Sequence, residues 1–235
     1  MELNARQQEI LYILYDTGKI SVSELAKKLY VTEMTVRRDL TAMEKGGYLR
    51  RYHGGAVLAS SPKEMPLAHR ILFDEEEKKE LAKKCLPFLK DNMNIYIDSS
   101  STCQYIIPHV SAFKNMKIIT NSVKALLSAS NLHIPCILIG GDYYEPDMCF
   151  VGSIAEQYAR ELNVDIMFFT TAAYSKEGLI SDFDEKQLAI RKIMLEHSLQ
   201  KVFLCEQNKI GQKMLHTLCR KEDITAVITA DSSNT

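Results

Sequence analysis

The sequence lacks the features that mark membrane, secreted and metal-binding proteins. None of its apolar runs is long enough to span a bilayer, and MELNARQQEI at the N-terminus has neither the basic start nor the apolar run of a signal peptide. The six histidines show no HExxH spacing, and the six cysteines are scattered without a CxxC pair, at Cys85, Cys103, Cys136, Cys149, Cys205 and Cys219. We therefore expect a cytoplasmic protein with reduced buried thiols, no metal site, no cofactor and no membrane partner.

The first 58 residues have the spacing of three short helices. Leu3–Tyr15 carries apolar residues at helical intervals. A second helix is predicted over Ser21–Leu29, where Ser21 and Glu24 have capping-box spacing. A third helix follows directly, with Thr32 as its N-cap. Three short helices in this order predict a helix-turn-helix unit.

The third predicted helix has two different faces. Val36, Leu40 and Met43 recur at helical spacing and are expected to face a core, which leaves Met34, Arg37, Arg38 and Thr41 on the opposite side. Arginine suits bidentate contact with guanine edges or phosphate, because its guanidinium carries fixed donors. An isolated Arg-Arg pair is typical of a solvated charged face, but the capped helix just upstream favours a helix that reads DNA.

A short hairpin, or wing, is predicted after Gly46-Gly47 ends the third helix. Tyr48–Tyr52 alternates toward a turn at His53-Gly54-Gly55, and Ala56–Leu58 returns. Arg50 and Arg51 cannot both face one side of a strand, so at least one is available to phosphate. Phosphate contacts supply affinity and register, while the recognition helix supplies sequence choice.

With VTEMTVRRDL at 31–40 and RYHGGAV at 51–57, residues 3–58 resemble the N-terminal domain of the DeoR family of bacterial transcriptional regulators. The resemblance implies that Thr35, Arg37 and Arg38 face DNA and that the His53-Gly54-Gly55 turn belongs to the wing. A winged helix that binds protein instead of DNA is the alternative. The predicted DNA-binding residues are Thr32, Met34, Thr35, Arg37, Arg38, Thr41, Arg50, Arg51, His53 and Gly54.

The basic character is local to this region. Residues 1–58 hold nine Lys/Arg against seven Asp/Glu, a net charge of +2, whereas the remainder holds 20 against 23, a net charge of −3. A near-neutral protein with one basic surface depends on docking geometry for DNA affinity, and we expect it to present two heads as a homo-oligomer.

A stretch of small and polar residues with two prolines, 59–66, predicts an exposed linker or strap. We therefore predict three parts: a winged helix-turn-helix domain over 1–58, a linker or strap over 59–73, and an effector-binding and oligomerisation domain over 74–235. The last part is expected to begin with a helix, because Asp74-Glu75-Glu76-Glu77 places acidic residues near a positive helix start.

Short apolar strands then alternate with helical segments, which predicts an α/β domain with a mostly parallel sheet. The predicted strands are Asn94–Asp98, Lys117–Thr120, Cys136–Gly140, Asp165–Phe169, Lys201–Cys205 and Thr225–Thr229. In open α/β sheets, ligands gather beyond the carboxyl ends of the strands. The residues that follow each strand are therefore the ones to inspect for chemistry.

Four of these strand ends carry hydroxyl groups, amides or bare backbone. They are Asp98-Ser99-Ser100-Ser101-Thr102, Thr120-Asn121-Ser122, Gly140-Gly141 and Thr170-Thr171. Helices follow the first two loops, so their free N–H groups favour phosphate. Any one such loop is more often a helix cap than a ligand site, but four of them together predict a site for a small anionic ligand.

The DeoR resemblance continues through this region, which is similar to the family's C-terminal domain. It implies a fold like that of ribose-5-phosphate isomerase and an effector that is a phosphorylated sugar or related metabolite. The chain departs from the family in two places: Ser100 and Ser101 replace the Gly-Thr of an Asp-x-Gly-Thr-Thr loop, and Glu206-Gln207-Asn208-Lys209 replaces Asp-x-Ser-Lys. A serine in place of the loop glycine tolerates positive φ poorly, so its hydroxyl either crowds the phosphate or donates to it. The cationic partners predicted for this ligand are Lys186 and Lys209.

Two functions follow from the whole sequence. The first is a repressor of carbohydrate metabolism genes, with operator DNA and a sugar phosphate as partners. The second is a sugar-phosphate isomerase with an accessory DNA-binding head, in which Asp98, Glu185 or Glu206 serves as the base. No base and carbonyl-polarising group stand at a required spacing, so the sequence favours the repressor.

Overall fold

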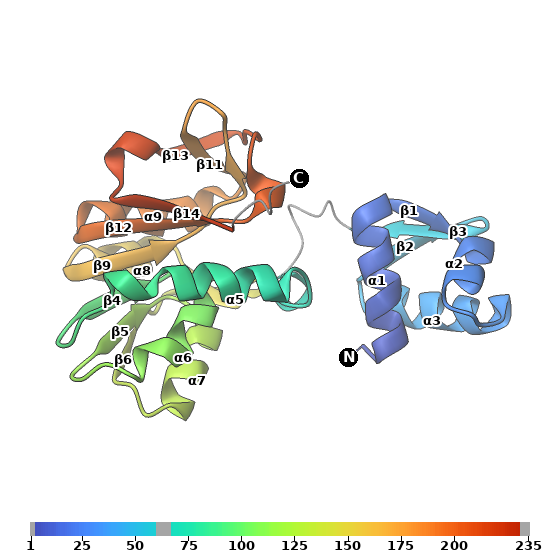
Figure 1. Cartoon of the computed structure of the whole chain (residues 1–235), viewed down its shortest axis with the longest axis horizontal. Helices are drawn as coiled ribbons and strands as arrows, with labels where there is room; N and C mark the ends of the chain where they lie inside the picture. The colour runs from blue at the N-terminus through green and yellow to red at the C-terminus, as the bar shows by residue number, and fades with distance from the viewer. Residues whose placement is uncertain (1–2, 60–66, 231–235) are drawn as a thin grey trace. The chain divides into compact units, whose positions relative to one another are not determined.

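The computed structural model describes residues 3–59 and 67–230, and the chain divides into two compact units, Met1–Phe73 and Asp74–Thr235. The N-terminal unit is a small helical domain with a three-stranded sheet (Figure 1). Its elements are α1 (Ala5–Thr17), β1 (Lys19–Ser21), α2 (Val22–Lys28), α3 (Glu33–Lys45), β2 (Leu49–Tyr52), β3 (Gly55–Leu58) and α4 (Leu67–Arg70).

The three predicted helices are confirmed, and each begins at a side-chain cap. Asn4 caps α1 and Ser21 caps α2, both in capping boxes with the residue three positions later. Thr32 caps α3 by accepting a hydrogen bond from the backbone N–H of Thr35. Gly18 follows α1 at φ 72°, a left-handed conformation that glycine adopts without strain. Local capping thus sets the boundaries that the sequence indicated.

The predicted wing is the antiparallel pair β2–β3, with Arg51 opposite Ala56 and Tyr52 opposite Gly55. The structure adds a strand that was not predicted, because β1 pairs with β3 on its other side, Ile20 opposite Ala56. Three residues are too few to show a strand alternation. The order β1-β3-β2 makes β3 the central strand of the wing sheet.

The N-terminal unit extends to Phe73, beyond the boundary predicted at residue 58. The Phe73 ring is buried and stacks on Tyr15, with ring centroids 4.4 Å apart, and meets Tyr12 edge-on at 5.0 Å. The Tyr12 hydroxyl also donates a hydrogen bond to the Leu72 carbonyl. Of the predicted linker, 60–66 lie outside the described residues, while 67–70 form α4. Aromatic packing on α1 is the reason that the end of the predicted linker belongs to this unit.

The C-terminal unit is an α/β domain (Figure 1). Its helices are α5 (Glu75–Lys84), α6 (Ile107–Val110), α7 (Val123–Asn131), α8 (Ser153–Ala159) and α9 (Glu185–Glu196), with 3-10 turns η2 (Leu86–Phe88), η3 (Cys103–Ile106), η4 (Glu145–Asp147), η5 (Gln207–Lys209) and η6 (Lys221–Asp223). Its strands are β4 (Asn94–Ile97), β5 (Lys117–Thr120), β6 (Cys136–Leu138), β7 (Asp142–Tyr144), β8 (Cys149–Val151), β9 (Val164–Phe169), β10 (Ala173–Tyr174), β11 (Leu179–Asp182), β12 (Ser198–Cys205), β13 (His216–Arg220) and β14 (Ala226–Thr229).

All six predicted strands are found, and together they form one sheet in the order β14-β12-β9-β4-β5-β6. Every pairing in this sheet is parallel. The chain fills the sheet from β4 outward to β6, returns to β9 beside β4, and then proceeds the other way to β14. The carboxyl ends of β4 and β9 therefore meet at the point where the strand order reverses, which is where open α/β sheets bind ligands.

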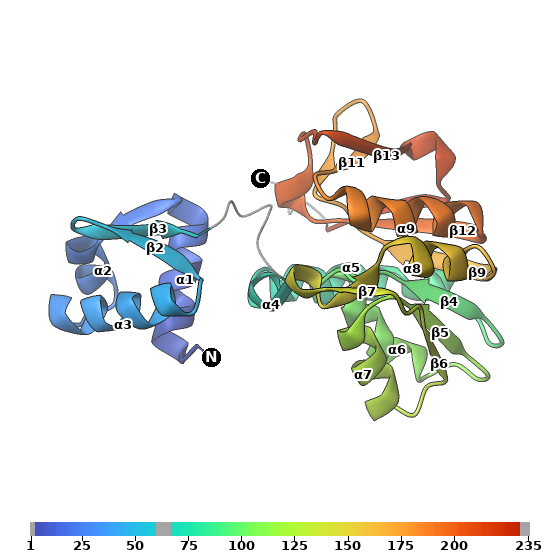
Figure 2. The same cartoon turned by 180° about the vertical axis from the view of Figure 1, so that it is seen from behind.

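Helices cover both faces of the parallel sheet (Figure 2). On one face, Ile95 and Ile97 of β4 pack against α5, α6 and α7. The other face packs Tyr96 with α8 and α9. Burial on both faces explains why the strands read as continuous apolar runs. The antiparallel sheet β10-β11-β13 and the β7–β8 hairpin were not predicted.

The six cysteines are free thiols, four of them buried and two half-buried. Burial raises the pKa of Cys85 to about 12, so this thiol stays protonated at neutral pH. No helix in residues 3–59 and 67–230 is both long and apolar enough to cross a membrane.

Candidate functional site

The exposed face of α3 carries the side chains predicted to read DNA. Met34 is 76% exposed, Arg37 and Arg38 are exposed, and Thr41 is half-buried on the same face. The opposite face is buried, as predicted, at Val36, Leu40 and Met43. The division of α3 into a buried stripe and an exposed basic face is therefore confirmed, while the contacts of these residues with DNA stay a prediction.

The two predicted threonines at the start of α3 are engaged in capping. The Thr32 hydroxyl accepts from the Thr35 backbone N–H, and the two hydroxyls lie 3.0 Å apart. These side chains fix the first turn of the helix, so any contact that they make with DNA is made from a capped helix start.

The exposed arginines differ in their partners. Arg37 pairs with Glu33 at 3.0 Å, and both side chains are about half exposed, at 51% and 50%. An exposed pair at this spacing contributes about 0.3–0.5 kcal/mol, so an incoming DNA phosphate or base can replace it. Within the described residues, Arg38 and Arg50 have no ion pair or side-chain hydrogen bond.

The wing is held beside α3 by Arg51. Its guanidinium donates to the Thr41 hydroxyl at 2.6 Å, and its backbone N–H donates to Glu44 at 2.8 Å. At the wing tip, His53 and Gly54 are exposed, and the Gly54 carbonyl accepts from the backbone N–H of Val22 at the start of α2. The structure thus places Arg51 of the wing beside Thr41 of α3, while the wing tip contacts the start of α2.

Asp39 was not predicted, although it lies in the motif VTEMTVRRDL. It is 3% exposed, and its carboxylate accepts hydrogen bonds from Arg6 at 2.6 and 3.3 Å and from Gln7 at 3.3 Å. Asp39 raises the pKa of Arg6, first through the side-chain hydrogen bond and then through its charge. A signal was present in the sequence, because an aspartate three residues after Val36 falls in the apolar stripe.

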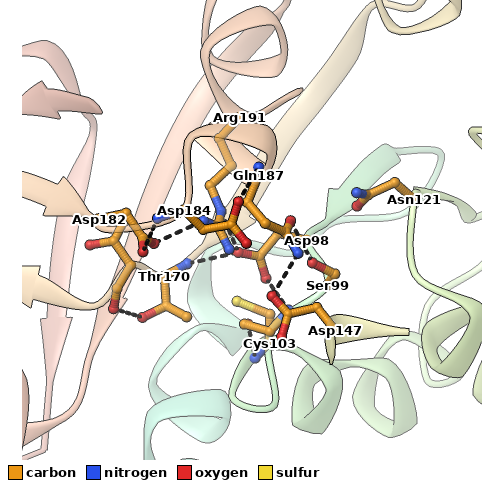
Figure 3. Close-up of polar contacts among 12 residues, drawn as sticks. Asp98, Ser99, Cys103, Asn121, Asp147, Thr170, Asp182, Asp184, Gln187 and Arg191 are labelled. Atoms are coloured by element: carbon orange, nitrogen blue, oxygen red, sulfur yellow. Dashed lines mark hydrogen bonds and ion pairs between the residues drawn. The ribbon is translucent and has the colours of Figure 1, made fainter. Parts of the chain in front are cut away.

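In the C-terminal unit, polar residues meet where the strand order reverses. Asp98 follows β4 and Thr170 follows β9, and the Thr170 backbone N–H donates to the Asp98 carboxylate at 3.1 Å. The backbone N–H of Ser100 donates to the other carboxylate oxygen at 3.0 Å. Figure 3 shows Asp98 at the centre of these contacts. Two of the four strand ends singled out in the sequence, those of β4 and β9, are therefore in direct contact.

Arg191 of α9 completes the surroundings of Asp98 and was not predicted. Its guanidinium lies 3.2 Å from Asp98 and 3.0 Å from Asp182 of β11, and all three side chains are buried (Figure 3). Burial disfavours the charged guanidinium, but the two carboxylates outweigh it and raise the pKa of Arg191. This arginine therefore stays charged inside the protein and ties α9 to β4 and β11.

Ser99 is linked to α9 and to the β7–β8 hairpin through Gln187. The Ser99 hydroxyl donates to the Gln187 side-chain carbonyl at 2.9 Å, and the Gln187 amide donates to Asp147 at 2.8 Å (Figure 3). Gln187 is buried and uses both ends of its amide. The loop after β4 is thus held from two sides.

A second group of charges surrounds Glu206, which follows β12. Its carboxylate accepts from Thr102 and Lys209, both at 2.6 Å, and lies 3.9 Å from the buried Lys78. Lys209 also donates to the Thr170 hydroxyl at 3.1 Å. Burial raises the pKa of Glu206, but Lys209 and Lys78 outweigh it and lower the pKa to about 2. Lys209 therefore lies in the site as predicted, and Lys78 and Glu206 are additional members.

The serines that replace the family's loop glycine and threonine are buried. The Ser100 hydroxyl accepts a hydrogen bond at 3.0 Å from the backbone N–H of Cys103, the first residue of η3. Ser101 is 4% exposed and makes no side-chain hydrogen bond to another described residue. Ser100 therefore stabilises the loop itself, while the Ser101 hydroxyl is the one in this loop without a protein partner.

The remaining predicted residues have structural contacts. Ser122 caps α7, and Asn121 accepts from Tyr96 and donates to Phe150. The Thr120 hydroxyl accepts from the Ser122 backbone N–H at 3.0 Å. Gly140 and Gly141 follow β6, and Gly141 lies so close to the Val151 carbonyl that a Cβ would be 2.6 Å from it. These loops shape the sheet edge around the site.

Lys186 lies apart from the ion pairs around Asp98 and Glu206. Its amine lies over the Tyr144 ring, 5.3 Å from the centroid, and the side chain is exposed. Arg191, one turn further along α9, provides the buried cation instead. The sequence does not distinguish the two, because both are basic residues of the same helix.

Ion pairs join six charged residues of the site. Three carboxylates, Asp98, Asp182 and Glu206, face three cations, Lys78, Arg191 and Lys209. Lys209 is the most exposed of the six, at 18% of its side chain. We call these six residues the strand-end charge cluster. An anion that enters it meets neutral donors and has to compete with Glu206 for Lys209.

Two family models match consecutive parts of the chain. A DeoR-like helix-turn-helix domain matches residues 6–62, and a DeoR C-terminal sensor domain matches residues 74–231. An uncharacterized HTH-type transcriptional regulator, YulB of Bacillus subtilis, is 32% identical over 229 residues, which are 95% of this chain and 87% of the relative. The lactose phosphotransferase system repressor of Staphylococcus epidermidis is 29% identical over 95% of this chain and 90% of its own length.

Solved structures resemble parts of the chain at low sequence identity. The eIF2B delta subunit of Chaetomium thermophilum covers 66% of this chain and 56% of its own, with a TM-score of 0.51 and 11% identity. A D-ribose-5-phosphate isomerase structure covers 58% of this chain and 54% of its own, with a TM-score of 0.44 and 19% identity. The sequence matches, which span both units, show that the chain belongs to the DeoR family of transcriptional regulators, with a helix-turn-helix domain followed by a sensor domain.

Proposed function

We propose that this chain is a cytoplasmic repressor of sugar metabolism genes, controlled by a phosphorylated sugar. The head binds double-stranded operator DNA through α3 and the β2–β3 wing, and the effector binds at the carboxyl ends of β4, β5, β9 and β12. Relatives named as lactose phosphotransferase system repressors support the sugar assignment, and the sensor-domain match supports a ligand.

The observation that carries the DNA assignment is the exposed basic face of α3. Arg37 and Arg38 point away from the core on a capped helix, and Arg51 fixes the wing beside it. Guanidinium groups on a helix that enters the major groove can read guanine, and unpaired cations such as Arg50 can bind phosphate. This arrangement serves DNA better than a protein partner, because it offers fixed cationic donors, and two of the exposed large side chains beside them, Tyr30 and Tyr52, carry polar hydroxyl groups.

DNA binding is tested by selection from a pool of random duplexes, followed by titration of the enriched duplex against a scrambled one. A repressor of this kind binds the enriched duplex about 10³-fold or more tightly than the scrambled one. A single small head makes few contacts, so the enriched sequence should contain two related half-sites, and light scattering should find a dimer or a larger oligomer. Equal binding of both duplexes would refute the operator assignment.

The effector assignment rests on the strand-end charge cluster and the hydroxyls around it. A phosphate would be held by the Ser101 and Thr170 hydroxyls, by backbone N–H groups and by Lys209 once Glu206 releases it. We expect binding to exchange one anion for another at Lys209, which gives the ligand a direct effect on the contacts of Glu206 with Thr102 and Lys78.

A thermal-shift panel of sugar phosphates, free sugars and inorganic phosphate tests this. A ligand at a hundred times its dissociation constant stabilises the folded state by about 2.7 kcal/mol, and each kcal/mol raises the melting temperature by roughly 2–4 °C for a chain of this size. One phosphorylated compound should give a shift of several degrees, which Lys209→Ala should weaken. Lys186→Ala is the matched control and should leave the shift unchanged. Hits among the free sugars alone would contradict a phosphate site.

The same site serves an isomerase poorly. A general base works best with a pKa near the operating pH, whereas the two lysines lower the pKa of Glu206 to about 2. Asp98 is occupied by Arg191 and two backbone N–H groups. Incubation with ribose 5-phosphate should therefore yield no ketose product, and ketose formation would favour the enzyme.

A further inference from the structure

The buried stripe of α3 contains one charged residue. Val36, Leu40 and Met43 are apolar, whereas Asp39 brings a carboxylate into the same stripe at 3% exposure. Burying a carboxylate costs free energy unless donors replace the lost water. The two donors here, Arg6 and Gln7, both come from the first turn of α1.

The donors themselves are held in place. Gln7 is 7% exposed, and its backbone N–H and side-chain carbonyl close the capping box with Asn4 at the start of α1. Arg6 contacts Asp39 through Nε at 2.6 Å and through a terminal nitrogen at 3.3 Å. Three directed hydrogen bonds therefore connect the capped end of α1 to one carboxylate of α3. We call this group of three residues, Arg6, Gln7 and Asp39, the α1–α3 clamp.

The clamp is not needed for stability alone. Leucine at position 39 would fill the stripe with apolar volume, and the partly exposed Arg6 would turn to solvent, so that only the buried Gln7 amide would lose its acceptor. Apolar packing, however, is non-directional, and it leaves a helix free to rotate slightly about its axis. A fork of N–H donors on a carboxylate fixes both rotation and translation. Arg38 is the neighbouring residue on the same helix turn, so any rotation of α3 displaces its guanidinium.

We propose that Asp39 is a positioning residue for operator recognition, which acts through the α1–α3 clamp to set the rotation of α3 and thereby the placement of Arg37 and Arg38. This inference rests on the DNA-binding function proposed above and names a residue that faces away from the DNA. The clamp determines sequence choice, because base contacts need accurate placement of side chains. It has little effect on phosphate affinity, which depends on charge and tolerates displacement.

The test separates stability from recognition in the full-length protein. Asp39→Leu and Arg6→Ala are compared with the exposed Glu9→Ala control of α1 in two assays: thermal unfolding, and affinity for the enriched duplex relative to the scrambled duplex. We expect Asp39→Leu to stay folded, with its melting temperature lowered by no more than the loss of one buried hydrogen bond, while the affinity ratio falls about tenfold or more, the loss expected for one misplaced bidentate base contact. Glu9→Ala should change neither quantity.

Arg6→Ala should lower the same ratio and leave the salt dependence of scrambled-duplex binding unchanged, because Arg6 acts on Asp39 and not on phosphate. Arg6→Lys should restore part of the ratio. A slope that falls by about one unit in Arg6→Ala would identify a phosphate contact and overturn the proposal. If Asp39→Leu fails to fold, the test rests on Arg6→Ala. In either variant that folds, a wild-type ratio of enriched-duplex to scrambled-duplex affinity refutes the positioning role. A wild-type protein that enriches no duplex would refute the proposed function itself, which is a different result.

Discussion

The two units use charge in opposite ways. In the N-terminal unit, the arginines of α3 and β2 lie at the surface, and two of them, Arg38 and Arg50, have no partner among the described residues. In the C-terminal unit, the six residues of the strand-end charge cluster neutralise one another inside the protein. The surface arginines can bind negative charge on another molecule, whereas the buried charges of the C-terminal unit are already paired with one another.

This difference matters for regulation. An arginine without a counter-ion, such as Arg38 or Arg50, can bind DNA phosphate without breaking an internal contact. A cluster whose cations are already paired can bind an anion only by breaking an internal contact, and a broken contact is a structural change. We therefore expect anion binding to change contacts inside the sensor unit more than DNA binding changes contacts at Arg38 and Arg50.

The largest effect is expected from breaking the buried balance at Arg191. Arg191→Leu leaves Asp98 and Asp182 buried without their cation, which should cost about 3–5 kcal/mol of unfolding free energy. Denaturant titration measures it. The adjacent Lys192→Leu changes an exposed lysine on the same helix and should stay within about 0.5 kcal/mol. Similar values for the two variants would show that the cluster is not a balanced unit.

Surface arginines should behave differently. Arg37→Ala and Arg38→Ala should each cost about 1–3 kcal/mol of operator binding free energy and relax sequence choice, because a bidentate base contact is lost. Unfolding free energy should hardly change, since both side chains are exposed. Gel-shift titration with the enriched duplex measures the effect, and Arg160→Ala, an exposed arginine of the other unit, is the control. Wild-type affinity in the double variant would remove α3 as the recognition helix.

Acid should weaken the C-terminal unit through Glu206. Its pKa is about 2 in the folded state against an ordinary value of 4.5, so its stabilisation is complete above pH 4.5 and is lost as the pH falls toward 2. Between these values Glu206→Gln should reduce the slope of unfolding free energy against pH by up to about 1.4 kcal/mol per pH unit. Denaturant titrations from pH 5 to pH 3 measure the slope. The exposed Glu161→Gln should leave it unchanged, and equal slopes in all three proteins would contradict the ion pairing of Glu206.

The smallest effect separates two neighbouring arginines of the wing. Arg50 has no partner in the described part of the chain, so Arg50→Ala should lower the salt slope of DNA binding by about one unit. Arg51 is bonded to Thr41, so Arg51→Ala should weaken binding with a smaller change of slope, and Thr41→Val should reproduce it. Fluorescence anisotropy at several salt concentrations measures both. Equal slopes for Arg50→Ala and Arg51→Ala would mean that both arginines contact phosphate.

The sequence predicted the elements whose pattern is local. Helix caps such as Ser21 with Glu24 are three residues apart, and the six parallel strands are apolar because both faces are buried. The antiparallel strands β11 and β13 could not be recognised in the same way, since Leu179–Asp182 and His216–Arg220 mix polar and apolar residues without alternation.

The sequence singled out the loops that follow the parallel strands. It did not identify the charged residues that contact these loops from distant parts of the chain. The meeting of the β4 and β9 ends follows from strand order in a parallel sheet. Arg191, in contrast, contacts Asp98 across 93 residues of sequence, and Lys78 contacts Glu206 from a helix that reads as a solvated, charged segment. Which lysine or arginine of such a helix turns inward depends on carboxylates elsewhere in the chain, and sequence periodicity does not contain that information.

The packing of Phe73 against Tyr12 and Tyr15 determines where the chain can be cut to give an isolated DNA-binding fragment. A fragment that stops at residue 58 would uncover two tyrosine rings on α1, and exposed aromatic patches promote self-association. A fragment that stops after Phe73 keeps its own covering ring and leaves Asp74 to begin α5 of the other unit. Weak DNA binding by the shorter fragment would then reflect a damaged protein surface and not the number of heads on the operator.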